Sequence, residues 1–199
     1  MMAEASTVDI ESYKALVDRC ARERLDHVIS NGSPVHARVL ISKLFETARH
    51  GAFIVSGKLL NATESGVEVY AYPDVVRAAM GFLRRPGSSL QIILEDPIDL
   101  LMENKFLAST INDVDRKGDV IVYPGTKAVN TTRSPHLMVT DALAYRLELD
   151  NKEFEAFANF GDDATAISVQ NLFKKLEGYL HQLRKPRLSF SPGQRFALS

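Results

Sequence analysis

The chain has 199 residues, of which 45% are hydrophobic and 25% are charged. These values are ordinary for a globular protein, and they exclude a wholly disordered chain, a collagen-like repeat and a disulfide-rich miniprotein. Twenty-four Lys and Arg residues against 25 Asp and Glu residues give a net charge of -1. Binding to nucleic acid would therefore require a local basic patch.

The chain contains one cysteine, Cys20, so an intrachain disulfide cannot form. Cys20 lies in a helical pattern, and we predict that it packs as a small apolar side chain in the core. No apolar run reaches the length of about 18 residues that indicates a membrane-spanning helix. The N-terminal residues lack the basic and apolar regions of a signal peptide, so we expect a cytoplasmic protein that does not enter a membrane.

Apolar residues at helical spacing predict helices, and short apolar runs bounded by turn residues predict strands. In chain order, we expect a helix over 8–29, a helix over 35–49, a strand over 52–55, a strand over 67–71, a helix over 73–83, a strand over 90–94, a helix over 98–110 and a strand over 119–123. The run over 52–55 is wholly apolar, which is typical of a strand buried on both faces of a parallel sheet. This alternation of helices and strands predicts an α/β sandwich.

The pattern then changes, because three strand candidates follow one another with short polar connections. They cover residues 136–140, 144–148 and 156–159, and this spacing predicts antiparallel pairing at one side of the sheet. An amphipathic helix over 163–183 follows. The sequence therefore predicts an α/β fold with a mixed, mostly parallel sheet sandwiched by helices and preceded by N-terminal helices.

The C-terminal residues 182–199 carry four positive charges and no negative ones, which leaves about -5 for the remaining 181 residues. Pro186 and Pro192 prevent the preceding helix from continuing. Leu188 and Phe190 alternate with polar residues, as in an edge strand that adds to a sheet. We predict that this arm becomes ordered only when it docks on a neighbouring subunit or a partner.

Several common site motifs are missing from the sequence. No Gly-rich dinucleotide motif follows the strand over 52–55, and no Walker loop, His/Cys cluster or nucleophile elbow occurs. We therefore expect no cofactor and no metal.

Two segments carry a resemblance to a known family. Eight residues from Ser134 read Ser-Pro-His-Leu-Met-Val-Thr-Asp, and five residues from Phe157 read Phe-Ala-Asn-Phe-Gly. This part of the chain resembles the phospholipase D-like superfamily, which carries H-x-K-x4-D on one strand and G-S-x-N on the next strands. The resemblance implies metal-free phosphoryl transfer, in which a His attacks phosphorus while Lys and Asn stabilise the phosphoryl oxygens. It also implies that two such motifs face each other within one chain or a homodimer.

The sequence departs from the family motif at its reactive positions. Aligning Asp141 with the motif Asp puts Ser134 where the nucleophilic His belongs and His136 where the Lys belongs. Ala156 and Phe157 replace the Gly-Ser pair, while Asn159 matches the motif Asn. A Ser without an evident base should not support the chemistry, so an active member would need His136 as its nucleophile.

The resemblance makes His136 the candidate catalytic residue and Ser134, Asp141 and Asn159 the candidates for binding phosphate or another ligand, and Lys58 is a further candidate for such binding. Lys58 comes from a different argument, because it follows the strand over 52–55 and ligands gather at the carboxyl ends of parallel strands. Each residue also has a structural interpretation. His136 would be a hydrogen-bonded strand residue, Asn159 and Asp141 would stabilise turns, and Lys58 would be a solvated loop residue.

The resemblance implies three segments: N-terminal helices over 1–34, a phospholipase D-like domain over 35–183 and the basic arm over 184–199. Our leading hypothesis is a catalytically degenerate member that acts as a binding or assembly subunit, either as a homo-oligomer or in a larger complex. Because small members of this family often belong to such complexes, the resemblance implies a bacterial complex that handles or restricts nucleic acid. The alternative is a homodimeric, metal-independent phosphodiesterase or nuclease that uses His136.

Overall fold

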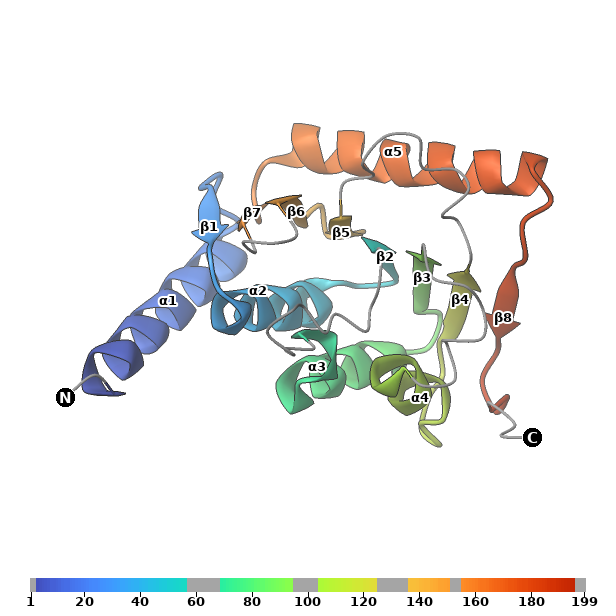
Figure 1. Cartoon of the computed structure of the whole chain (residues 1–199), viewed down its shortest axis with the longest axis horizontal. Helices are drawn as coiled ribbons and strands as arrows, with labels where there is room; N and C mark the ends of the chain where they lie inside the picture. Colours follow the sequence, from blue (N-terminus) through green and yellow to red (C-terminus); the bar gives the residue numbers. More distant parts are fainter. Residues whose placement is uncertain (1–2, 57–68, 95–103, 125–135, 151–154, 196–199) are drawn as a thin grey trace.

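The computed structural model describes residues 3–56, 69–94, 104–124, 136–150 and 155–195 (Figure 1). Within these residues the chain forms one mixed sheet with helices on both faces. The strands are β1 (Ile29–Asn31), β2 (Gly51–Ser56), β3 (Ser89–Leu94), β4 (Asp119–Tyr123), β5 (His136–Thr140), β6 (Tyr145–Asp150), β7 (Glu155–Asn159) and β8 (Leu188–Phe190). The helices are α1 (Ala3–Glu23), α2 (Pro34–Thr47), α3 (Pro73–Leu83), α4 (Lys105–Ile111) and α5 (Asp163–Gln182), and a 3-10 turn, η1, covers Val69–Ala71.

The strand order is β1-β7-β6-β5-β2-β3-β4-β8. Strand β3 pairs parallel with β2 on one side and with β4 on the other, and the other five pairings are antiparallel. The prediction of a mostly parallel sheet is therefore wrong, while the α/β class and the helices on both faces are confirmed. The antiparallel pairing of β5, β6 and β7 is as their short connections predicted. The excess of antiparallel pairs comes from β5 joining β2, and from β1 and β8, which extend the two edges of the sheet.

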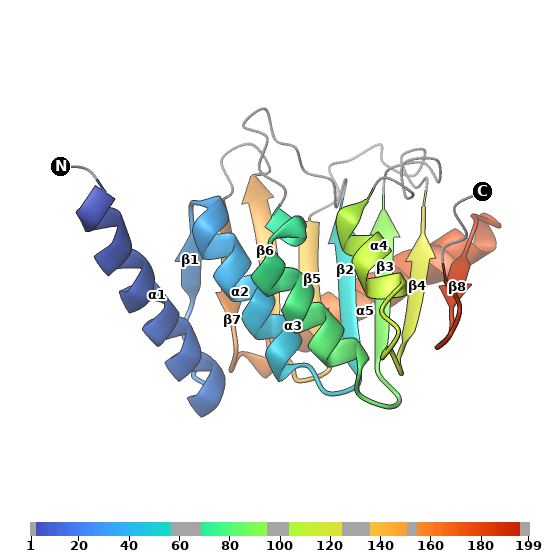
Figure 2. The same cartoon turned by 90° about the horizontal axis from the view of Figure 1, so that it is seen from below.

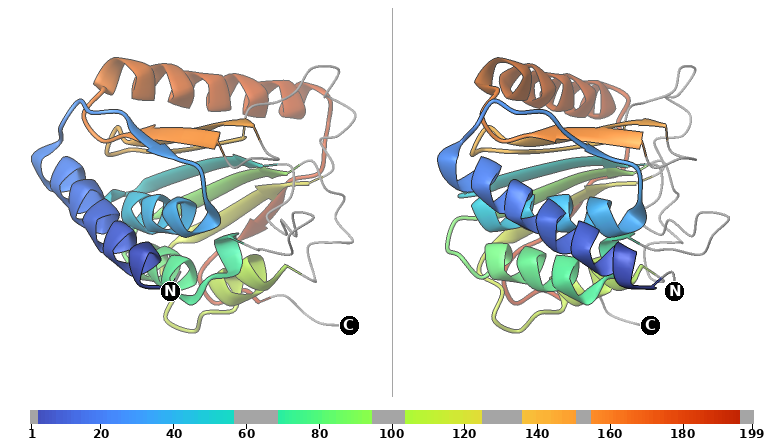
Figure 3. Two further views of the ribbon diagram at one scale, coloured as in Figure 1. Left: turned by 60° about the vertical axis from the view of Figure 1, so that its left-hand side comes forward. Right: turned by 90° about the vertical axis from the view of Figure 1, so that its left-hand side faces the viewer.

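The helices form two unequal layers. Figure 3 shows α1 to α4 on one side of the sheet and α5 on the other, so we call these sides the four-helix face and the α5 face. On the four-helix face, Phe45 of α2 packs against Phe82 of α3 and Phe106 of α4, with ring centroids 6.2 and 6.1 Å apart. On the α5 face, the rings of Phe53 and Phe173 lie 5.2 Å apart. Cys20 is fully buried in the first of these layers, as predicted.

The first helix is shorter than its apolar pattern predicts. α1 ends at Glu23, where Arg24 adopts a left-handed φ of 50°, and residues 29–31 form β1 instead of a last helical turn. Strand β1 pairs antiparallel with β7, so tertiary pairing overrides the helical periodicity. The predicted turn before α2 is confirmed, because the Ser33 side chain accepts a hydrogen bond from the His36 amide at 3.2 Å and Pro34 opens the helix.

Two further expectations differ from the structure. The predicted strand over 67–71 is a 3-10 turn where it is described, and its Tyr70 ring packs edge-on against Phe106 at 5.3 Å. Residues 67 and 68 lie outside the described residues. The helix expected over 98–110 is described from Lys105 onward and is capped by Asn104, whose side chain accepts from the Leu107 amide at 2.9 Å.

The C-terminal arm forms a strand without a partner molecule. β8 pairs antiparallel with β4 through Val120, Ile121 and Val122, so the arm completes the sheet of its own chain. The predicted edge strand is therefore confirmed, but the prediction that the arm needs a second subunit to become ordered is wrong. The alternating sequence identified the strand, whereas it carried no information about which sheet edge the strand would join.

Candidate functional site

The carboxyl ends of four strands meet at one edge of the sheet. Figure 2 shows β2, β3, β4 and β6 ending at this edge, and β5 begins there. In open α/β sheets, ligands bind beyond such ends. His136 is the first residue of β5, and together with Ser56 at the end of β2 it lines a cavity of about 20 Å³. This edge is therefore the candidate site.

Two charged residues of β6 lie beside His136. Glu148 is directly opposite His136 in the register of β5 and β6, and Arg146 is opposite Met138. Residues two apart on a strand share a face, so all three polar side chains point to the four-helix face. The Glu148 Oε2 atom lies 3.7 Å from His136 Nδ1 and 3.3 Å from Arg146 Nη1. The Arg146 Nε group also donates to the side-chain oxygen of Asn31 at 3.3 Å.

The charges of this cluster are almost completely removed from water. The side chains of Arg146 and Glu148 are 6% and 10% exposed. Burial alone would raise the pKa of the Glu148 carboxyl, but the neighbouring His136 imidazole and the positive charge of Arg146 outweigh it, and the pKa lies below its usual value. Burial also raises the pKa of the Tyr70 phenol, which lines the same cavity. Glu148 is therefore a stable anion at neutral pH.

This arrangement holds one carboxylate between a guanidinium and an imidazole. When the imidazole is neutral, Arg146 and Glu148 balance each other, and protonation of His136 adds one positive charge. A water molecule needs about 10 to 15 Å³ of such cavity volume, so the described cavity of about 20 Å³ admits a water molecule and no larger ligand. The chemistry available here is orientation of His136 by a carboxylate, combined with a buried positive charge.

Asp141 and Asn159 lie at the opposite end of the strands. The carboxylate of Asp141 accepts hydrogen bonds from the amides of Arg49 and His50 at 2.8 and 2.7 Å. It therefore ties the turn after β5 to the turn before β2. Asn159 is opposite Tyr145, whose side chain packs on the α5 face, whereas His136 points to the four-helix face.

Asn159 stabilises the turn that leads into α5. Its side-chain oxygen accepts from the amides of Gly161 and Asp162 at 2.8 and 3.0 Å, and its Nδ2 group donates to Asp26 at 2.8 Å. A Cβ atom on Gly161 would lie 2.2 Å from the carbonyl oxygen of Arg24, so only glycine allows the chain after α1 to pack here. The structure thus brings Asn159 to a junction of backbone segments and not to His136.

Lys58 and Ser134, the other two predicted ligand contacts, lie outside the described residues. In the sequence, Lys58 follows Ser56 by two residues and Ser134 precedes His136 by two. Arg146 and Glu148 were missed by sequence reasoning. Their signal was an opposite-charge pair two residues apart, alternating with the apolar residues Tyr145 and Leu147, which places both charges on one face of the strand.

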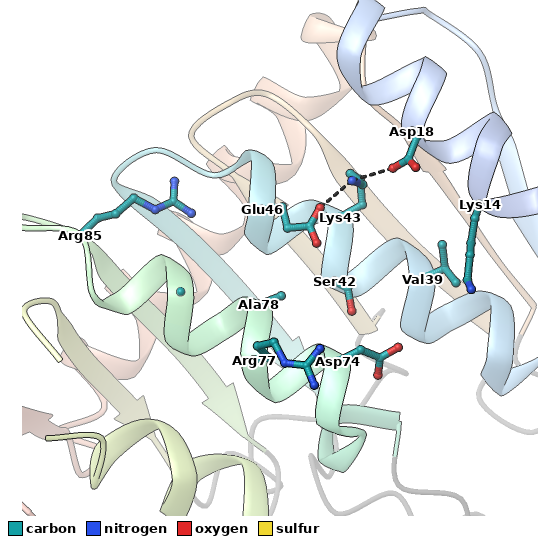
Figure 4. Close-up of a pocket in the computed structure, with 11 residues that line it drawn as sticks. Lys14, Asp18, Val39, Ser42, Lys43, Glu46, Asp74, Arg77, Ala78 and Arg85 are labelled. Carbon is teal, nitrogen blue, oxygen red and sulfur yellow. Dashed lines mark hydrogen bonds and ion pairs between the residues drawn. The ribbon is translucent and has the colours of Figure 1, made fainter. Parts of the chain in front are cut away.

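A larger groove of about 670 Å³ lies between α1, α2 and α3 (Figure 4). Several of the charged side chains that line this groove already bind other groups of the protein. Lys43 forms ion pairs with Asp18 and Glu46 at 2.6 and 2.5 Å, and Arg85 donates to the backbone carbonyls of Ala48 and Phe45. Because acidic and basic side chains alternate in this groove, it has no clear preference for one sign of ligand.

Within the described ranges, no three His, Cys, Asp or Glu side chains come together in a way that could hold a metal ion. Among the same residues, no helix is both long and apolar enough to cross a membrane.

Comparison with known proteins identifies no family. No family model matches the sequence, and no curated protein matches it. Similar solved structures include TrmBL2, an archaeal chromatin protein with a novel mode of DNA binding, at 12% identity and a TM-score of 0.49 over 88% of this chain. This chain spans 62% of that protein's length. NucT from Helicobacter pylori is 19% identical with a TM-score of 0.48, over 75% of this chain and 95% of that one.

Proposed function

We propose that this chain is a catalytically degenerate phospholipase D-like protein that acts as a binding or assembly subunit of a complex that handles or restricts nucleic acid. The observation that carries the proposal is the separation of His136 from Asn159. The family chemistry needs a His and an Asn around one phosphoryl group. Here the two side chains belong to opposite faces and opposite ends of the sheet.

The directions of the strands explain this separation. β5 leads away from the edge where His136 lies, β6 returns to it, and β7 leads away again. The strand that returns to this edge therefore places Arg146 and Glu148 beside His136, and Asn159 lies elsewhere. A carboxylate close to His136 would repel a phosphodiester, which supports a non-catalytic role. Lys58, Ser134 and His136 are the proposed ligand contacts at this edge.

The test is a cleavage assay in the presence of a chelator. The substrates are a chromogenic phosphodiester, single-stranded DNA and double-stranded DNA, and the matched variant is His136→Ala. We expect no cleavage by the parent protein. Cleavage that disappears in His136→Ala would overturn the proposal in favour of a homodimeric phosphodiesterase.

One observation favours that second candidate. The Glu148 carboxylate lies 3.7 Å from His136 Nδ1, and a carboxylate that orients an imidazole is typical of a His that acts as a base or nucleophile. If this were its role, Glu148→Gln would reduce cleavage strongly while the protein stayed folded by circular dichroism. Under the leading proposal, neither the parent nor this variant cleaves.

The proposed assembly role also predicts a second copy or a larger complex. Light scattering at micromolar concentration checks it, and we expect a species larger than the 22.1 kDa chain. A monomer that also captures no partner in a pull-down from the native host would contradict an assembly role.

A further inference from the structure

The last helix and the arm that follows it carry an unusual concentration of positive charge. Residues 164–190 contain five Lys and Arg residues and one acidic residue, a net charge of +4 in a chain whose total is -1. We call the five basic residues the basic strip: Lys174, Lys175, Arg184, Lys185 and Arg187. The rest of the chain therefore carries a net negative charge of about -5.

The basic strip faces solvent. Lys174, Lys175, Arg184 and Arg187 are exposed, and Lys185 is half-buried. Within the described residues, no carboxylate forms an ion pair with any of the five. The single acidic residue of this region, Glu177, accepts a hydrogen bond of 2.6 Å from the Tyr123 phenol and so points back towards the sheet.

The arm is held next to the helix by the same tyrosine. Arg187 Nε donates to the Tyr123 hydroxyl at 3.2 Å, and that hydroxyl donates to Glu177 on α5. This chain of hydrogen bonds keeps the start of the arm against the last turns of the helix. Lys174 lies eight residues before the last helical residue, Gln182, which corresponds to about 12 Å along the helix axis, and Arg184 follows two residues after the helix ends.

An exposed glycine interrupts the basic strip. Gly178 lies in the C-terminal part of α5, four residues before its end at Gln182, and a Cβ atom built on it meets no atom within 4 Å. Glycine is among the least favourable residues inside a helix, and no internal packing requires it here. A glycine without an internal reason permits close approach of another backbone. Lys174 and Lys175 precede it by one helical turn, so such a backbone would meet two positive charges.

An exposed aromatic ring lies beside the lysines. Tyr179 is 47% exposed and follows Lys175 by four residues, so the two side chains share one side of the helix. Positive charges next to exposed aromatic rings are typical of surfaces that bind single-stranded nucleic acid, because the charges contact phosphates and the rings stack on bases.

We infer that the basic strip, with Gly178 and Tyr179, binds a single strand of nucleic acid. This inference deepens the proposed binding role and rests on it. The surface is distinct from the His136 edge, and it needs no residue of that edge. It also differs from the groove between α1, α2 and α3, where acidic and basic side chains alternate.

The test is fluorescence anisotropy with a labelled oligo-dT across a range of salt concentrations. The strip variant is Lys174→Gln with Lys175→Gln and Arg184→Gln. We expect at least tenfold weaker binding at low salt. We also expect the slope of log affinity against log salt to fall by about 2, since each phosphate contact with a single strand contributes about 0.7.

A matched control removes the same charge from α1 by changing Lys14, Arg19 and Arg22 to Gln, all exposed residues. We expect this control to bind within twofold of the parent. If the strip variant and the control bind equally well, the inference is wrong. It is also wrong if the parent shows no binding at low salt. A third contradicting result would be that polyglutamate displaces the labelled oligonucleotide as effectively as unlabelled oligo-dT at the same concentration of negative charge.

Two further variants test the close approach and the stacking. Gly178→Gln should raise the melting temperature and weaken binding, whereas Gly81→Gln, at another exposed helical glycine with free space, should not weaken it. Tyr179→Ala should weaken binding to oligo-dT by about fivefold or more. Cleavage that His136→Ala abolishes would overturn the non-catalytic role but would leave these binding results unaffected.

Discussion

The buried arginine that holds the C-terminal arm offers the sharpest test of how this fold is stabilised. Arg116 is 4% exposed, and among the described residues its guanidinium donates to backbone carbonyls. The acceptors are the carbonyl oxygens of Ile111, Gly118, Phe190, Ser191 and Gln194, at 2.7 to 3.2 Å. Three of these five belong to the arm. Burial lowers the pKa of Arg116, although Asp119 and Asp113 oppose this effect.

The change to make is Arg116→Ala. It leaves the carbonyls of the buried residues Ile111 and Gly118 without this donor, and each buried unsatisfied group costs about 1 to 3 kcal/mol. The acceptors in the arm are partly or fully exposed, so they add little. With the lower end of the range for each of the two, the free energy of unfolding should fall by about 2 kcal/mol. For a chain of this size that corresponds to roughly 4 to 8 °C in Tm.

The assay combines thermal melting with amide hydrogen exchange. In Arg116→Ala, the amides of residues 188–190 should lose protection before the rest of the sheet, because the arm detaches first. Arg19→Ala is the matched control, since Arg19 is 65% exposed and its ion pair with Glu23 should be worth less than about 1 kcal/mol. If Arg116→Ala melts within about 2 °C of the parent and keeps protection at 188–190, the reasoning is refuted.

Three more changes test other contacts. Gly161→Ala forces a Cβ to 2.2 Å from the Arg24 carbonyl oxygen and should cost about 3 kcal/mol or more in a denaturant titration. Glu148→Gln leaves the Arg146 charge buried without its counter-charge and should cost about 3 to 5 kcal/mol at pH 7. The folded-state pKa of Glu148 is lowered, so its contribution is complete above the usual value of 4.5 and is lost as pH falls through the folded pKa. The variant should therefore lose less stability than the parent during acid titration. Tyr123→Phe removes hydrogen bonds to α5 and to the arm, and its melting curve should report a loss of about 1 to 2 kcal/mol.

The sequence predicted the longer elements well because they carry long apolar patterns. Strands β2 to β7 and helices α2, α3 and α5 agree closely with the ranges expected from composition and turn residues. Strand direction was predicted in part. The antiparallel pairing of β5, β6 and β7 is as their short connections indicated, whereas the direction of β5 against β2 was not predictable, since an apolar run reads the same in parallel and antiparallel pairing. The three-residue strand β1 was missed because Leu25 and Val28 continue the helical spacing of α1, and only pairing with β7 overrides that pattern.

The site was harder to predict than the fold. His136 could be selected from the family resemblance, but its charged neighbours depend on the register between β5 and β6. That register follows from the turn after Thr140, in which Leu143 adopts a left-handed φ of 57°. A one-residue shift would have turned Arg146 and Glu148 to the other face. Asn159 fits the motif by local sequence, yet one additional reversal of the chain places it far along the strands from His136.

The short strand β8 changes how this sheet meets other molecules. Without it, β4 would be a five-residue edge with unpaired amides and carbonyls, which is a template for uncontrolled pairing with other chains. With it, both outer strands of the sheet, β1 and β8, are only three residues long. β8 is also followed directly by Ser191 and Pro192. Proline cannot donate to a strand ladder, so the outer border of the sheet resists extension. The arm therefore protects the folded chain against aggregation, and conditions that release it should convert a monodisperse protein into one that self-associates through β4.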